Sequence, residues 1–296
     1  MNIGLIDVDG HNFPNLALMR LSAYHKTRGD NVEWWDGFRH YDKVYMSKVF
    51  TFSCDIDTCI SADEIVRGGT GYKDYGNLPE IVERMFPDYT LYPKWNSAIG
   101  FLTRGCIRNC AWCIVPKKEG TIRPAATWEE VKREDSRDII LMDNNILAHE
   151  HGLEQIAQMG RADIRVDFNQ GLDARLITPA IAKSLSKVKL IRFLRMSCDT
   201  SEMLDVIEQA TAYLREAGVP SWRFWCYALV QNVEEAYNRV IALNAMGVTP
   251  FAQPYRDYDG GEPTAEQRRF ARWVNNKALF KSCDYHDLIG GRNDAD

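Results

Sequence analysis

Between residues 97 and 256 the chain alternates short apolar runs with amphipathic segments, and this rhythm constrains the fold more than any other feature. Apolar runs predict six strands, over Ala98–Thr103, Asp138–Met142, Arg165–Phe168, Leu190–Met196, Trp222–Val230 and Thr249–Gln253. Helical spacing predicts the segments between them as helices, over Trp128–Asp135, Gly152–Met159, Pro179–Leu185, Glu202–Glu216 and Val233–Met246. Strands that alternate with helices in this way indicate a parallel α/β barrel, here a six-unit (βα) partial barrel because a complete barrel has more units.

Residues 3–71 predict a smaller parallel α/β domain. Its strands are expected over Ile3–Val8, Asn31–Trp35, Lys43–Met46 and Glu64–Arg67, with a helix after Pro14. Glycines and prolines between Tyr72 and Pro93 predict a linker. The expected organisation is therefore a small domain with its linker (1–92), the partial barrel (97–256) and a C-terminal helical extension (257–296), whose helix spans Thr264–Lys281.

Charge and hydropathy exclude several classes of protein. The chain has 36 basic and 41 acidic residues, a net charge of −5, so charge does not indicate a nucleic-acid partner. Charges interrupt every apolar run before it reaches the length of a membrane helix, which argues against a membrane partner. The first residues lack the pattern of a signal peptide, and we expect a cytoplasmic protein.

Three of the eight cysteines lie close together, directly after the first predicted barrel strand. Cys106, Cys110 and Cys113 have the spacing C-x3-C-x2-C, and Trp112 precedes the last of them. A structural zinc site normally has a fourth cysteine or histidine, but the next histidine, His149, lies beyond a whole predicted βα unit. Three thiolates can instead hold an iron–sulfur cluster with one iron left open.

This loop resembles the signature of the radical S-adenosylmethionine superfamily, in which the same motif follows the first strand of a six-unit barrel. The resemblance implies that Cys106, Cys110 and Cys113 bind a [4Fe-4S] cluster whose open iron is chelated by S-adenosylmethionine, and that Trp112 lies against the adenine. It further implies reductive cleavage of S-adenosylmethionine to a 5′-deoxyadenosyl radical that abstracts hydrogen from a substrate, here unknown. An electron donor such as flavodoxin or ferredoxin would serve this reaction.

Polar residues at other strand ends are candidates for binding the cofactor. Asp143, Asn144 and Asn145 follow the second strand, where the superfamily usually has a Gly-Gly-Glu-like segment that binds the cofactor's amino group. Resemblance also implies cofactor-binding groups on the fourth strand, where we select Arg195 and Ser197. The alternative for each residue is a helix cap or a loop hydrogen bond.

The whole chain is similar to the subgroup with an N-terminal cobalamin-binding-like domain. The resemblance implies that this small domain is flavodoxin-like, but residues 1–92 are short for a cobalamin-binding domain. The cobalt-ligand pattern Asp-x-His-x-x-Gly is absent, and His11 is offset from it, so we expect no cobalamin. The alternatives are an enzyme like the methylthiotransferases, for which Cys54 and Cys59 offer too few upstream cysteines, a cobalamin-dependent methylase, or a non-catalytic iron–sulfur or zinc protein. Cys198 and Cys226 are expected in the core.

Overall fold

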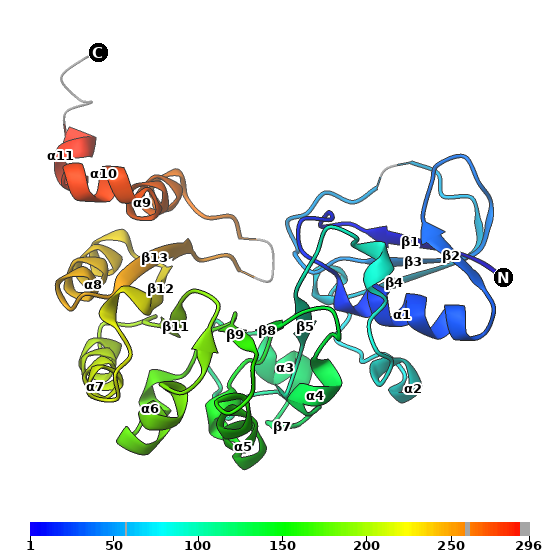
Figure 1. Ribbon diagram of the computed structural model, residues 1–296. Coiled ribbons are helices and arrows are strands. Elements are labelled where there is room, and N and C mark those ends of the chain that lie inside the picture. Colours follow the sequence, from blue (N-terminus) through cyan, green and yellow to red (C-terminus); the bar gives the residue numbers. More distant parts are fainter. Residues whose placement is uncertain (57, 258–260, 291–296) are drawn as a thin grey trace.

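The computed structural model describes residues 1–56, 58–257 and 261–290 as an α/β protein with several parallel sheets. The predicted C-terminal extension therefore includes residues, 258–260 and 291–296, that lie outside the described part. Figure 1 shows a small sheet with the N-terminus beside an arc of strands that has helices along its outer side, and the C-terminal helices at the far end of the arc. No helix in the described ranges is both long and apolar enough to cross a membrane.

The N-terminal sheet has four parallel strands in the order β2-β1-β3-β4, which confirms the predicted small parallel sheet. The strands are β1 (Asn2–Asp7), β2 (Asn31–Trp34), β3 (Tyr41–Ser47) and β4 (Ala62–Gly68). Helix α1 (Leu16–Thr27) begins at Asn15, whose side chain accepts a hydrogen bond from the Leu18 N–H. The linker forms η1 (Thr70–Tyr72), α2 (Glu80–Glu83) and η2 (Tyr89–Leu91).

The arc consists of two parallel sheets, in the orders β10-β9-β8-β5 and β11-β12-β13, and a single bridge between Leu172 and Met196 joins them. The strands are β5 (Ala98–Gly100), β8 (Asp138–Leu141), β9 (Arg165–Phe168), β10 (Lys189–Leu190), β11 (Leu194–Ser197), β12 (Phe224–Val230) and β13 (Thr249–Pro254). No closed barrel forms among the described residues.

Helices cover the outer side of this arc (Figure 1). They are α4 (Trp128–Val131), α5 (Glu150–Met159), α6 (Pro179–Leu185), α7 (Met203–Glu216) and α8 (Val233–Ala245), with short turns η3 (Ile146–Ala148), η4 (Ala174–Leu176) and η5 (Ser221–Arg223). The short helix α3 (Val115–Glu119), which precedes α4 in the chain, has no buried residue and is not one of these covering helices. Alternate strand residues such as Ile139 and Leu141 pack against these helices in the largest hydrophobic core.

Two of the predicted strands are interrupted, because side chains distant in the sequence form hydrogen bonds with their backbone groups and take them out of the sheet. The run Ala98–Thr103 divides into β5 and β6 (Thr103–Arg104), and β6 pairs antiparallel with β7 (Arg123–Pro124). The run Leu190–Met196 divides into β10 and β11. Between them, the Arg223 guanidinium donates hydrogen bonds to the carbonyl oxygens of Leu190 and Arg192.

The N-terminal domain packs on the inner side of the arc. Met19 of α1, Tyr92 of the linker and Ile99 of β5 form one buried cluster, and Ile140 of β8 packs against it. Ile140 lies between Ile139 and Leu141 and so faces away from the outer helices. At the other end of the arc the Arg256 guanidinium lies 4.0 Å from the Phe52 ring centroid. The N-terminal domain therefore contacts both ends of the arc.

The C-terminal extension covers the open edge of β13. It forms three helices in the described residues, α9 (Ala265–Asn275), α10 (Lys277–Ser282) and α11 (Tyr285–Gly290), whereas the sequence predicted one helix. The helix breaks at Asn276, whose side chain accepts hydrogen bonds from the N–H groups of Ala278 and Leu279. Asn275 both donates to the Ala252 carbonyl (2.9 Å) and accepts from the Ala252 N–H (2.8 Å), as a neighbouring strand would.

We predict that Asn275→Ala lowers the free energy of unfolding by about 1–3 kcal/mol, because it removes two hydrogen bonds from the backbone of an edge strand. Urea unfolding monitored by circular dichroism measures this change. The control is Asn244→Ala at the exposed end of α8, for which we expect a change within about 0.5 kcal/mol. Equal stability of the two variants would mean that Asn275 does not protect the edge.

Candidate metal centre

The three predicted ligand cysteines lie on the loop between β6 and α3, at the carboxyl edge of the arc. Gly105 starts the loop with φ of +83°, and a Cβ there would lie 2.4 Å from the Thr121 carbonyl oxygen. Glycine is therefore required for the loop to fold back against the segment before β7. The Cys106 N–H donates to the Gly120 carbonyl at 3.2 Å, and the Cys113 N–H donates to the Cys110 carbonyl at 3.0 Å.

Asp143 fixes the start of this loop. Its buried carboxylate accepts hydrogen bonds from the N–H groups of Leu102 and Thr103 and from the Thr103 hydroxyl (2.7 Å). Burial raises the pKa of Asp143 to about 6, and these donors partly oppose that rise. The side chain predicted to bind a cofactor thus points to the backbone and holds the chain that leads into the cysteines.

Glu119, at the end of α3, binds the start of the same loop, and no sequence pattern indicated it as a site residue. Its carboxylate accepts from the Arg104 Nε at 3.1 Å, from the Gly105 N–H at 2.9 Å and from the Asn144 Nδ2 at 2.9 Å. Asn144, a predicted cofactor residue, therefore contacts the end of α3. In the sequence, Glu119 differs from its neighbours only as the one acid among the basic residues around the motif.

Asp173, at the carboxyl end of β9, joins the cysteine loop to two other elements. It accepts from the Arg108 Nε at 2.9 Å, from the Arg175 Nε at 2.6 Å and from the Asn145 Nδ2 at 3.2 Å. The Asn145 Nδ2 also lies 3.5 Å from the Cys106 Sγ, and the Arg108 N–H donates to the same sulfur at 3.3 Å. Of the predicted cofactor residues, Asn145 is thus in direct contact with a predicted metal ligand.

The three thiols influence one another and are close to charged groups. Burial raises the pKa of the Cys110 thiol and of the Cys113 thiol, and the negative charges of the neighbouring cysteines raise both further. The Arg175 guanidinium opposes the rise of the Cys110 pKa. A bound cation would oppose it as well, because a metal stabilises the thiolate.

Trp112 extends from the cysteine loop to the end of β11. Burial raises the pKa of Asp199, whereas a hydrogen bond from the Trp112 side chain and the charge of Arg239 lower it. Asp199 also raises the pKa values of Cys110 and Cys113. The loop is therefore connected to β11 through Trp112 and to β9 through Arg108.

Arg195 and Ser197 lie on the inner face of β11, because Leu194 and Met196 between and beside them pack with the outer helices. Arg195 makes an ion pair with Asp167 of β9, which no sequence pattern indicated as a site residue. Ser197 is half-buried and is paired with Tyr227 of β12. Cys198 and Cys226 are fully buried, which confirms their predicted place in the core.

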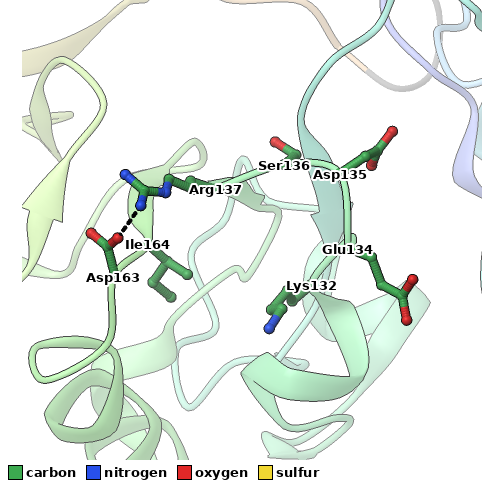
Figure 2. A pocket seen from close by; sticks show the side chains of 7 residues that line it. All are labelled: Lys132, Glu134, Asp135, Ser136, Arg137, Asp163 and Ile164. Carbon is green, nitrogen blue, oxygen red and sulfur yellow. Dashed lines mark ion pairs between the residues drawn. The ribbon is translucent and has the colours of Figure 1, made fainter.

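Two hollows lie away from the cysteines. Figure 2 shows one at the amino ends of β8 and β9, lined mainly by charged side chains, among which Arg137 and Asp163 form an ion pair. The other lies beside Trp225, Phe251 and Lys277, near the amino ends of β12 and β13. Neither meets the carboxyl edge, where parallel α/β folds carry their functional loops.

Within the described ranges, no three histidine, cysteine, aspartate or glutamate side chains are grouped so that they could hold a single metal ion. This result concerns one ion, whose ligands all converge on one centre. The cysteines of an iron–sulfur cluster each bind a different iron, so their sulfurs lie farther apart.

Comparison with models of protein families and with curated proteins found no match to this chain.

We predict that the stability of the wild type falls, relative to Asp143→Asn, as the pH rises from about 4 to 6. The folded-state pKa of Asp143 is raised to about 6 from 3.8, so the folded protein binds this proton more tightly than the unfolded chain. Its contribution is present in full below the lower value and is lost above the higher one, a change of about 3 kcal/mol. Urea unfolding of both proteins from pH 3.5 to 7.5 measures it, and a constant difference would contradict the assignment.

Proposed function

We propose that this protein is a radical S-adenosylmethionine enzyme that uses a [4Fe-4S] cluster on Cys106, Cys110 and Cys113. The observation that carries the proposal is the three-cysteine loop on the carboxyl edge of the arc, whose start is held by two carboxylates, the buried Asp143 and the half-buried Glu119. Three cysteines leave one iron of such a cluster without a protein ligand. That open iron distinguishes the proposed cluster from a structural metal site, in which the protein supplies every ligand.

The strand order supports the resemblance to a six-unit partial barrel. In the described residues, β5, β8, β9, β11, β12 and β13 succeed one another along the arc in sequence order, and the neighbouring strands within each sheet are parallel. The N-terminal domain contacts both ends of the arc, and these contacts would shield the carboxyl edge between them. Pockets favour such domain interfaces.

The residues around the loop fit a cluster that binds S-adenosylmethionine. Two N–H groups donate to the Cys106 sulfur, and hydrogen bonds of this kind stabilise the thiolate ligands of iron–sulfur clusters. The Asn145 Oδ1 is buried without a hydrogen-bond partner in the described structure. An amino group of a bound molecule would satisfy this carbonyl oxygen. When bound, the cluster and S-adenosylmethionine would supply an electron and a 5′-deoxyadenosyl radical.

The chain's own residues would hold and shield this centre. Asp143 and Glu119 keep the loop in place, and Asp173 holds the guanidinium groups of Arg108 and Arg175 near the cysteines. Their positive charge would favour anionic groups of the cluster and cofactor. The inner residues Arg195 and Ser197 lie on the strand face that a substrate would meet.

Contacts within the N-terminal domain support a role in covering the arc and not in binding cobalamin. Its strand order is flavodoxin-like, and such folds bind ligands where β1 and β3 diverge. The chain itself fills that place: the Asp7 carboxylate accepts hydrogen bonds from Tyr92 (2.9 Å) and Asn15 (3.4 Å), and the His11 ring lies 4.2 Å from the Trp34 ring. A Cβ at Gly69 would lie 2.4 Å from the Lys48 carbonyl oxygen, so the glycine-rich turn packs on the protein.

Anaerobic reconstitution with iron and sulfide, followed by a reductant and S-adenosylmethionine, tests the proposal. We expect the wild type to bind about one cluster and to release 5′-deoxyadenosine and methionine. Alanine at Cys106, Cys110 or Cys113 should abolish both results. Alanine at Cys54, an exposed cysteine of the N-terminal domain, is the control and should change neither.

Three results would contradict the proposal. Binding of zinc without sulfide would indicate a structural metal site. A stable cluster that never yields 5′-deoxyadenosine would indicate a non-catalytic iron–sulfur protein. Cluster loss in the Cys54 variant would require ligands from the N-terminal domain and would favour an enzyme like the methylthiotransferases.

We predict that hydroxocobalamin added during refolding is removed by desalting, because the place between β1 and β3 is filled by Tyr92, Asn15 and the glycine-rich turn. The absorbance spectrum of the desalted protein checks this result. A corrinoid retained at one equivalent would overturn the covering role and would make methyl transfer the leading reaction.

A further inference from the structure

Asn145 occupies an unusual position for an amide side chain. It is 2% exposed and follows β8, and its Nδ2 lies between the Cys106 Sγ at 3.5 Å and the Asp173 Oδ2 at 3.2 Å. The Arg108 backbone N–H reaches the same sulfur at 3.3 Å. One cysteine of the loop therefore has two N–H donors.

Asp173 determines which end of the Asn145 amide faces the sulfur. An ionised carboxylate only accepts hydrogen bonds. Burial raises the pKa of Asp173, but hydrogen bonds from Arg175 and Arg108 lower it by more, so that its pKa lies below the ordinary value and the group is ionised at neutral pH. The amide group next to Asp173 must then be the NH₂. Because the same NH₂ is next to the sulfur, rotation of the amide would place an oxygen against both negative groups.

We infer that Asn145 sets the reduction potential of the cluster by donating a hydrogen bond to the Cys106 thiolate. The inference rests on the proposed function only in that the three cysteines hold a [4Fe-4S] cluster. Reduction adds one electron to the cluster and so increases the negative charge on its sulfurs. An N–H dipole aimed at a ligand sulfur stabilises the reduced form more than the oxidised form and raises the potential.

The surroundings allow this effect to be separated from that of nearby charges. Arg108 and Arg175 are held by Asp173 through their own contacts, so Asn145→Leu removes the amide without removing either guanidinium. Asn169 provides a matched control, because its Nδ2 also donates to a sulfur, that of Met142 at 3.6 Å, which is not a predicted ligand. Asn169→Leu removes an amide of the same kind after the next strand.

The test is a redox titration of the reconstituted full-length protein without S-adenosylmethionine, followed by the electron paramagnetic resonance signal of the reduced cluster. At a fixed potential, Asn145→Leu should lower the ratio of reduced to oxidised cluster about tenfold. This change corresponds to a reduction potential that is about 59 mV more negative. Asn169→Leu should leave the ratio unchanged. Resonance Raman spectra should show a stronger Fe–S(Cys) bond only in the Asn145 variant.

The outcomes separate this inference from the proposed function. An unchanged potential in Asn145→Leu, or an equal shift in Asn169→Leu, overturns the role of Asn145, although the wild type still cleaves S-adenosylmethionine. A wild-type cluster that cleaves none refutes the function but leaves the potentials measurable. Asn145→Ala is the second variant; if both Asn145 variants fold like the wild type but lose the cluster, Asn145 retains the cluster and the inference is wrong.

Discussion

The buried carboxylate of Asp143 is the contact on which the cysteine loop depends. By accepting the N–H groups of Leu102 and Thr103, it takes the chain out of the parallel sheet just after β5. The chain then turns at Gly105, where no other residue fits without a shift of the Thr121 backbone. Burial of Asp143 disfavours its charged form and raises its pKa. This cost is offset because the carboxylate accepts hydrogen bonds from backbone N–H groups that would otherwise lack partners at that position.

An open arc of parallel strands has two unprotected features, its edge and its inner face, and different parts of the chain cover them. Asn275 satisfies the backbone of β13 at the edge, as α9 packs beside that strand. The inner face of β5 and β8 is covered by α1 and the linker through Met19, Tyr92 and Ile140. The segments outside the arc thus protect its edge and inner face, whereas a complete barrel has no strand edge because it is closed.

The sequence predicted the features that depend on local pattern. Alternating apolar residues gave the parallel α/β class and the N-terminal sheet, and glycines marked many helix ends. The divided strands were not predictable, since Asp143 and Arg223 act on backbone groups that are about 30 to 40 residues away in the chain. The break at Asn276 had a local signal, an asparagine that can cap a helix, within a continuous amphipathic pattern.

The same distinction holds for the candidate site. Spacing and position after a strand made Cys106, Cys110 and Cys113 the candidate ligands, because residues on one loop are close in the sequence. The contacts of Asp173 with Arg108 and Asn145 join three elements, and no pattern within one segment could show them. Asp143 and Asn144 were selected for their place at a strand end, and the structure shows them bonded to the base of the loop.

Mössbauer spectroscopy tests most directly whether the three cysteines leave one iron of a cluster open to S-adenosylmethionine. Protein reconstituted with ⁵⁷Fe is measured before and after S-adenosylmethionine is added. If one iron is open, we expect the signal of that iron site to change, toward higher coordination, while the signal of the others stays the same. A spectrum that S-adenosylmethionine leaves unaltered, or one without an iron–sulfur cluster, would rule out an open iron at the three cysteines.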